Sequence, residues 1–162
     1  FLIDAFKKSN LIREGYILNI FGKGHLEKKI RLKIKSEKLH KSVFLKGWSN
    51  DLTREYKKSK IFVLPSLYEG LGNVLLEAIN YGLISVATDC KSGPKEILMN
   101  GRGGSIVPVN DIKFLANTFD DLIINKKFAK KKLNIAKKNL RRFYYKSQSE
   151  KYLILLNNIL NK

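Results

Sequence analysis

Residues 61–88 read IFVLPSLYEGLGNVLLEAINYGLISVAT, and this stretch determines the fold prediction. Two short apolar runs, 61–64 and 84–88, enclose a glycine-rich loop and a segment with helical spacing, 73–81. The two runs are continuously apolar rather than alternating, which is typical of strands buried on both faces. Such strands belong to a parallel sheet that helices cover on both sides.

The same alternation of strand and helix continues in both directions along the chain. Further strands are predicted at 16–21, 42–45 and 105–109. Further helices are predicted at 1–8, 25–39, 51–58, 94–98, 111–124, 127–143 and 148–160. We therefore predict an α/β fold, a doubly wound Rossmann-like parallel sheet with helices on both faces and additional C-terminal helices. Neither a repeat nor an interior linker interrupts the sequence, so residues 1–162 are predicted to form one domain.

Composition excludes several classes of protein. The chain has 162 residues, of which 44% are hydrophobic, so a core can form and wholesale disorder is excluded. Its one cysteine, Cys90, excludes an internal disulfide and is predicted to be a small buried residue. No apolar run is long enough to cross a bilayer, and the N-terminus lacks a signal-peptide pattern.

The formal net charge is +18, and it is unevenly distributed. Residues 1–60 carry a net +10 and residues 113–162 another +10, whereas residues 61–112 carry −2. Such a balance is compatible with a compositional bias, an anionic membrane surface or a nucleic-acid partner. Nucleic acid is the least favoured, because no stacking-aromatic pattern, zinc-ligand spacing or basic region with heptads accompanies the charge.

The loop between the two central strands carries the most chemical information. In a doubly wound sheet, ligands bind beyond the carboxyl ends of the strands, where this loop lies. Gly70 and Gly72 let the backbone turn sharply and approach a ligand. The helix that follows opens near Gly72, so its free N–H groups and the positive end of its dipole favour a diphosphate.

Two glutamates eight residues apart flank this turn. Glu69 precedes the glycines, and Glu77 is the single carboxylate on an otherwise apolar helix. A helical side chain leans toward the helix N-terminus, so the Glu77 carboxylate is expected to point back toward the loop. If it is buried it needs hydrogen-bond donors, which sugar or ribose hydroxyls, backbone N–H groups or a lysine could supply.

The whole string resembles a known family. An apolar strand, P-S-x-x-E-G-x6-E-A across 65–78, Y-G at 81–82, a second strand and G-P-x-E at 93–96 resemble the retaining glycosyltransferases of family 4. These enzymes have the GT-B fold of two Rossmann-like domains. Glu69 and Glu77 match the family's E-x7-E motif, and the resemblance covers residues 1 to about 120. The sequence at 89–96 resembles that of bacterial enzymes that build O-antigen, capsule or other surface glycans from UDP-sugars.

The resemblance implies roles by position. Glu77 would hold the ribose hydroxyls of the nucleotide, and Glu69 would act as the catalytic residue that contacts the donor sugar. Further donor contacts would come from the loops after the strands, at Gly70, Leu71, Gly72 and Asn73 for the diphosphate and at Gly22, Gly24, Gly47 and Trp48 for the nucleotide. Trp48 could stack on the base or pack against the strand-end loops.

The resemblance also implies what else the protein needs. No D-x-D triplet is present, so we expect neither a metal nor another cofactor. The chain would be the C-terminal, donor-binding half of a retaining hexosyltransferase and, on its own, inactive. We expect the acceptor-binding N-terminal domain and the first strand of this domain to be absent. The C-terminal helix at 148–160 would dock on that N-terminal domain.

Three functional hypotheses remain at this point. The first is a donor domain that binds a UDP-sugar, a UDP-hexose or UDP-N-acetylhexosamine, for transfer to a lipid-linked or saccharide acceptor in bacterial surface polysaccharide synthesis. This domain would be cytoplasmic, with a peripheral position on the inner face of the membrane through the basic run 126–142. The second is a basic α/β module that binds nucleic acid, recognisable by a steep salt dependence. The third is a non-catalytic nucleotide-sugar binder.

Overall fold

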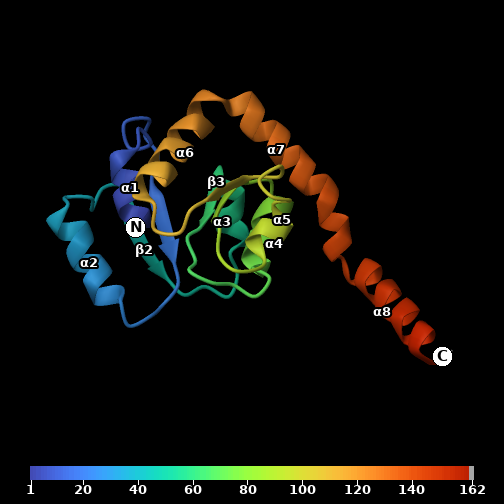
Figure 1. The fold of residues 1–162 in the computed structure, drawn as a ribbon. Helices are drawn as coiled ribbons and strands as arrows, with labels where there is room; N and C mark the ends of the chain where they lie inside the picture. Colours follow the sequence, from blue (N-terminus) through green and yellow to red (C-terminus); the bar gives the residue numbers. More distant parts are fainter. Residues whose placement is uncertain (161–162) are drawn as a thin grey trace.

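Two parallel ladders of strands form the centre of the computed structural model, which describes residues 1–160 (Figure 1). The first ladder pairs β1 (Leu18–Phe21) with β2 (Val43–Gly47). The second has the order β3 (Ile61–Leu64), β4 (Ile84–Thr88) and β5 (Ser105–Val107). All three pairings are parallel, which confirms the predicted parallel α/β architecture.

The two ladders are not joined by hydrogen bonds. Within residues 1–160 the strands form a two-stranded and a three-stranded sheet, and no pairing connects β1 with β3. One hydrophobic cluster nevertheless extends across both ladders, since it contains Val43 of β2 together with Val86 of β4 and Val107 of β5. The prediction of one continuous sheet therefore holds for the strand directions and the shared core, but the hydrogen-bonded ladder is interrupted.

Helices connect the strands and follow them. The connecting helices are α1 (Leu2–Lys8), α2 (Glu27–Ser36), α3 (Thr53–Lys58), α4 (Asn73–Asn80) and α5 (Pro94–Ile97). The chain then continues through α6 (Ile112–Ile124), α7 (Lys126–Asn139), the 3₁₀ turn η1 (Leu140–Phe143) and α8 (Tyr145–Leu160). Each predicted helix is present, with ends that differ from the prediction by a few residues.

Helices cover both faces of the three-stranded sheet. Successive residues of a strand point to opposite faces, and here Val86 packs with Phe119 of α6 on one side. Its neighbour Ala87 packs on the other side with Leu75 of α4 and Ala136 of α7. The prediction of helices on both faces is confirmed, and the strands between them are correspondingly apolar.

The C-terminal helix α8 leaves the body of the domain. In Figure 1, α6 and α7 arch over the sheet, and α8 then projects away from it toward the C-terminus. No residue of α8 is buried, although its apolar side chains include Tyr152, Leu155 and Ile159, which are 67%, 55% and 61% exposed. The predicted apolar stripe on this helix is therefore present and uncovered within residues 1–160.

Candidate functional site

The carboxyl ends of the parallel strands meet at one edge of each sheet, and the predicted site residues follow these ends. Gly22 follows β1 and Gly47 ends β2, and the Gly22 N–H donates to the Gly47 carbonyl at 2.8 Å. Both glycines have positive φ, 131° and 72°, which favours glycine at these positions. Gly24 is exposed, with nothing within 4 Å of the position a Cβ would take, so this turn leaves open space beside the strand ends.

Trp48 lies on the surface beside this pair. Its side chain is 68% exposed, and the indole N–H donates to the Asn50 side-chain oxygen at 2.7 Å. Of the two interpretations offered by the sequence, packing against the strand-end loops is wrong. The hydrogen bond fixes the edge of the ring while most of the ring stays accessible to a planar partner.

Glu69 lies in the loop after β3 and is held by hydrogen bonds from two loops. Ser66 donates its hydroxyl proton to Glu69 Oε1 at 2.6 Å, so one carboxylate oxygen is engaged. Ser92, from the loop after β4, donates to the Glu69 backbone carbonyl at 2.6 Å. Glu69 is half-buried, and its side chain and backbone are thus both anchored.

The β4–α5 loop also presses against the glycine turn. A Cβ on Gly93 would lie 2.4 Å from the Leu71 carbonyl oxygen and 2.6 Å from that of Gly70. Only a residue without a side chain allows this approach, and Gly93 also has φ 77°. The backbone at Gly70 and Leu71 is therefore in direct contact with the loop that follows the neighbouring strand.

A buried hydroxyl fixes the start of the same loop. Thr88, at the end of β4, is 1% exposed and its hydroxyl lies within hydrogen-bond distance of the carbonyls of Leu64 and Ser66. The chain leaving β3 is thereby tied to β4 on the way to Glu69. A buried hydroxyl without such a partner would cost free energy, so this bond specifies the path of the loop.

Helix α4 begins directly after the glycine turn. Gly72, its N-cap, has the left-handed conformation (φ 85°, ψ 57°) and offers no side chain to the first N–H groups of the helix. Asn73 is exposed at the first position. Free N–H groups at a helix N-terminus, with the positive end of the dipole, suit an anion such as a phosphate.

Glu77 lies on the exposed face of α4 and not in its apolar face. Burial, the condition under which its carboxylate would need hydrogen-bond donors, is therefore not met. Its protein partner is Tyr56, whose hydroxyl donates to Glu77 Oε2 at 3.1 Å. Tyr56 comes from α3 and is 6% exposed, so one oxygen of an accessible carboxylate is held by a buried side chain.

The Tyr56 hydroxyl stays protonated because of its surroundings. Burial raises the pKa of Tyr56 most, and the hydrogen bond to Glu77 and the negative charge of Glu77 raise this pKa further. The phenol therefore acts as a hydrogen-bond donor throughout the physiological pH range.

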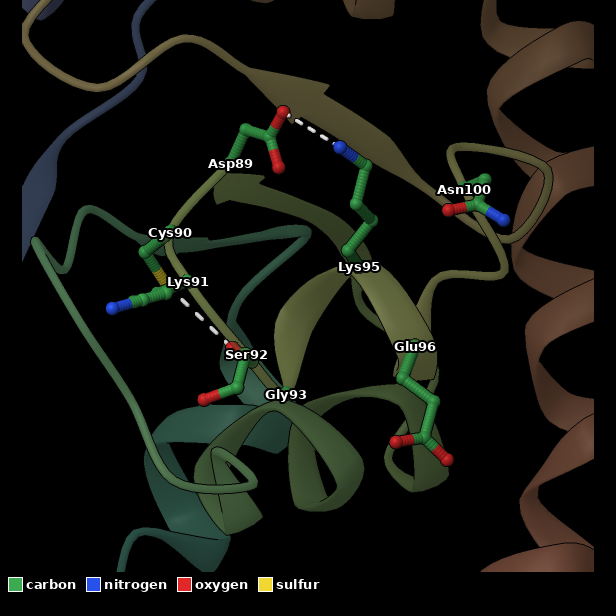
Figure 2. A pocket seen from close by; sticks show the side chains of 8 residues that line it. All are labelled: Asp89, Cys90, Lys91, Ser92, Gly93, Lys95, Glu96 and Asn100. Atoms are coloured by element: carbon green, nitrogen blue, oxygen red, sulfur yellow. Dashed lines mark hydrogen bonds and ion pairs between the residues drawn. The ribbon is translucent and has the colours of Figure 1, made fainter.

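Two surface hollows lie outside the predicted donor residues. One, of about 560 Å³, borders the β4–α5 loop and is lined by Asp89, Cys90, Lys91, Ser92, Gly93, Lys95, Glu96 and Asn100 (Figure 2). In it, Lys95 pairs with Asp89 at 2.8 Å, and Cys90 is buried as predicted. The other, of about 810 Å³, lies between β5, α6 and α7. Neither hollow is lined by Glu69 or Glu77.

Residues 1–160 contain no cluster of three or more His, Cys, Asp or Glu side chains placed to ligate a metal ion. Among the same residues, no helix combines the length and the apolar character needed to cross a membrane.

Comparison with known families identifies the family of the chain. The family described as Glycosyl transferases group 1 matches residues 1–142. The chain belongs to this family. This group 1 glycosyltransferase domain has the α/β architecture of solved GT-B structures, as its fold and the structural matches show.

Its relatives include bacterial enzymes named for the transfer of sugars or for exopolysaccharide. An exopolysaccharide phosphotransferase of Streptomyces coelicolor is 38% identical over 75% of this chain and 13% of the relative. A UDP-Gal:alpha-D-GlcNAc-diphosphoundecaprenol alpha-1,3-galactosyltransferase of Escherichia coli is 32% identical over 73% of this chain and 31% of the relative. The crystal structure of an S. aureus TarM mutant with fondaparinux, alpha-GlcNAc-glycerol and UDP has a TM-score of 0.85 at 27% identity, over 96% of this chain and 32% of that one. The domain thus spans a third or less of these proteins.

The structure brings some of the predicted residues together and leaves others apart. Residues 69–73 form one loop and helix start, braced by the β4–α5 loop. Gly22, Gly47 and Trp48 gather at the end of the other ladder, and no hydrogen bond within residues 1–160 joins them to the Glu69 loop. The supporting hydroxyls were missed from the sequence. Ser66 could have been found three residues before Glu69, whereas Tyr56, Thr88 and Ser92 approach only through the fold.

Proposed function

We propose that this domain binds the nucleotide-sugar donor of a retaining, metal-independent family 4 transferase that builds a bacterial surface polysaccharide. The donor is a UDP-hexose or UDP-N-acetylhexosamine. The observation that carries the proposal is the anchored turn between Glu69 and Glu77, whose glycine backbone leads into the free N-terminus of α4 at the carboxyl edge of the strands. The family match and the galactosyltransferase activity for which one relative is named support the same class of reaction.

The chemistry follows from these groups. Helix N–H groups and the dipole of α4 stabilise the diphosphate as negative charge develops on it during departure. Glu77 accepts the ribose hydroxyls, and Glu69 lies where the sugar would follow the diphosphate. A charge-assisted hydrogen bond to a carboxylate contributes about 1.5–3 kcal/mol, so losing the Glu77 contacts weakens binding at least about tenfold.

An amide NMR titration with UDP, compared with GDP and ADP, tests donor binding. We expect shifts at residues 70–73 and near Trp48, selective for UDP and largely lost in Glu77→Ala. Glu77 is exposed, so this substitution removes a carboxylate without opening a cavity. Glu14→Ala, an exposed glutamate on the turn before β1, is the matched control and keeps full affinity. Absence of UDP-dependent shifts at millimolar nucleotide would contradict the proposal.

We propose further that this domain is the C-terminal half of a two-domain enzyme. Two features support this: the lack of hydrogen-bonded pairing between the β1–β2 and β3–β4–β5 sheets within residues 1–160, and the uncovered apolar face of α8, which suits the acceptor-binding domain. The 162-residue chain is then expected to bind donor without transferring sugar. Transfer to any acceptor by this chain alone, above background, would contradict the two-domain requirement.

We also propose a peripheral position on an anionic membrane, and the charge of α7 and its surroundings supports this proposal. From Leu122 to Ser149 the chain has ten Lys and Arg and no Asp or Glu. The exposed side of α7 carries Lys127, Lys130 and Lys131. Each cation near an anionic lipid surface contributes about 1 kcal/mol, so these three account for roughly a hundredfold in partitioning.

Vesicle sedimentation tests this position. We expect the chain to bind phosphatidylcholine vesicles containing phosphatidylglycerol and not pure phosphatidylcholine vesicles. Replacing the three α7 lysines by glutamine abolishes most of that binding. The control replaces three exposed lysines of α2, Lys28, Lys29 and Lys35, and therefore removes the same charge elsewhere. Equal losses in both variants would show that net charge and not this surface is responsible.

A further inference from the structure

Tyr56 is a tightly packed aromatic side chain near the predicted donor residues. It lies on α3 and is 6% exposed. Its ring stacks on Tyr81 with 5.3 Å between the centroids and meets the edge of Phe62 at 6.2 Å. The same cluster contains Ala78, on the buried side of α4 next to Glu77. The ring therefore has one position, and so does its hydroxyl.

The hydroxyl directs its single proton to Glu77. It lies 3.1 Å from Glu77 Oε2 and 3.5 Å from the Val74 carbonyl oxygen. A hydrogen bond to an ionised acceptor is the stronger of the two, and here it is also the shorter. Glu77 is exposed and would otherwise move freely, because an unpaired glutamate on a helix surface keeps its rotamer freedom.

Only one of the two carboxylate oxygens is used. Within residues 1–160, Oε2 accepts from Tyr56 and Oε1 accepts from no protein group. Glu69 shows the same arrangement, since Oε1 accepts from Ser66. In both glutamates a hydroxyl of the protein takes one oxygen and fixes the direction of the other.

Resting on the proposed donor binding, we propose that Tyr56 is a positioning residue that holds Glu77 so that its free oxygen meets the ribose hydroxyls. Tyr56 itself contacts no nucleotide. The hydrogen bond from Tyr56 already restricts the Glu77 side chain in the nucleotide-free protein. Glu77 therefore loses less rotational freedom when the nucleotide binds, and the entropic cost of binding is smaller. Removing the hydroxyl is expected to weaken UDP about fivefold to tenfold, the range of one hydrogen bond.

The test compares Tyr56→Phe with Tyr81→Phe. Both substitutions delete one hydroxyl from the same stacked pair, but the Tyr81 hydroxyl bonds Thr53 at 3.0 Å and does not touch Glu77. Dissociation constants are measured for UDP and for 2′,3′-dideoxy-UDP, which lacks both ribose hydroxyls. We expect Tyr56→Phe to weaken UDP and to leave the dideoxy compound unchanged, while Tyr81→Phe changes neither. In a Glu77→Ala background, Tyr56→Phe should have no further effect on UDP.

Two results would overturn this role. Equal UDP affinity in Tyr56→Phe and the native chain would show that the hydroxyl does not position Glu77. An equal loss for UDP and the dideoxy compound would show a general disturbance of α4. These outcomes are distinct from failure of the proposed function, in which the native chain itself binds no UDP and both proposals fall together.

Discussion

Gly93→Ala is the substitution whose cost in folding free energy follows most directly from the structure. The new methyl group would lie 2.4 Å from the Leu71 carbonyl oxygen, whereas ordinary contacts begin at 3.4 Å. The two loops would therefore have to separate by about 1 Å. Gly93 also has φ 77° and ψ −77°, a conformation that L-residues rarely adopt.

The two costs add. A side chain at this φ costs about 1–2 kcal/mol, and forcing a group into an occupied space costs about 1–3 kcal/mol. The free energy of unfolding is therefore expected to fall by roughly 2–5 kcal/mol, a large part of the about 5–15 kcal/mol of a typical domain. If the loop yields instead, residues 70–71 move by about 1 Å, and UDP affinity falls while most of the stability remains.

Gly15→Ala separates the cost of the backbone conformation from the cost of the steric clash. Gly15 has φ 75°, close to that of Gly93, but nothing lies within 4 Å of its Cβ position. This variant therefore carries the conformational cost alone, about 1–2 kcal/mol, with UDP affinity unchanged. Urea unfolding and UDP titration of both variants are the assays. If Gly93→Ala and Gly15→Ala have the same UDP affinity and unfolding free energies within roughly 0.5 kcal/mol of each other, the β4–α5 loop does not brace the turn at residues 70–71.

Three further outcomes are expected. Thr88→Val keeps the shape of a buried side chain but leaves the Ser66 carbonyl without its donor, so unfolding free energy falls by about 1–3 kcal/mol; no loss in urea unfolding would show that the bond is dispensable. Phe119→Ala, at a side chain 1% exposed, costs about 3–5 kcal/mol, and a loss under about 1 kcal/mol would place this ring outside the core. The pKa of Tyr56 is near 10 in the unfolded chain and is raised above that value in the folded state. The stability that protonated Tyr56 contributes to the fold is therefore complete below about pH 10 and is lost as pH rises toward the folded pKa. Between about pH 10 and 11 the native chain should lose up to about 1.4 kcal/mol more than Tyr56→Phe, and parallel pH profiles would contradict this.

The strands and the order of the helices could be predicted because most apolar runs end at a glycine or proline. The runs 61–64 and 84–88 match β3 and β4 to the residue. Other ends were less exact: the last strand stops at Val107, directly before Pro108, and not at 109, and the helix predicted at 127–143 ends at Asn139 and continues as a 3₁₀ turn. Helix α8 begins at Tyr145, before the predicted 148, because no buried residue marks its start.

The ladder interruption could not be predicted from local pattern. An apolar run specifies a strand buried on both faces, but which strand lies beside it depends on the whole set of neighbours. β1 and β3 each pair on one edge only within residues 1–160, with β2 and β4 respectively. The two sheets nevertheless share one hydrophobic core, so side-chain packing connects them although no strand hydrogen bonds do within residues 1–160.

The environment of the two glutamates shows the same limit. The spacing of Glu69 and Glu77 identified both residues, because the motif is local. Of their supports only Ser66 is close in sequence, three residues before Glu69, whereas Tyr56 is 21 residues from Glu77 and Ser92 is 23 residues from Glu69. Each support comes from the element beside the strand or helix that it braces. The position of such groups is fixed by the parallel order of strands and not by any pattern in the sequence.

The two glutamates are held by separate supports. Glu69 is braced from the loop after β4, whereas Glu77 is braced from α3 through an aromatic cluster. A disturbance of one brace therefore need not reach the other glutamate, since the two networks share no hydrogen bond within residues 1–160. Gly93→Ala and Tyr56→Phe are accordingly expected to act additively on UDP affinity, as substitutions at independent sites do. A double variant that loses no more affinity than the worse single one would show instead that α4 moves as a unit and couples the two glutamates.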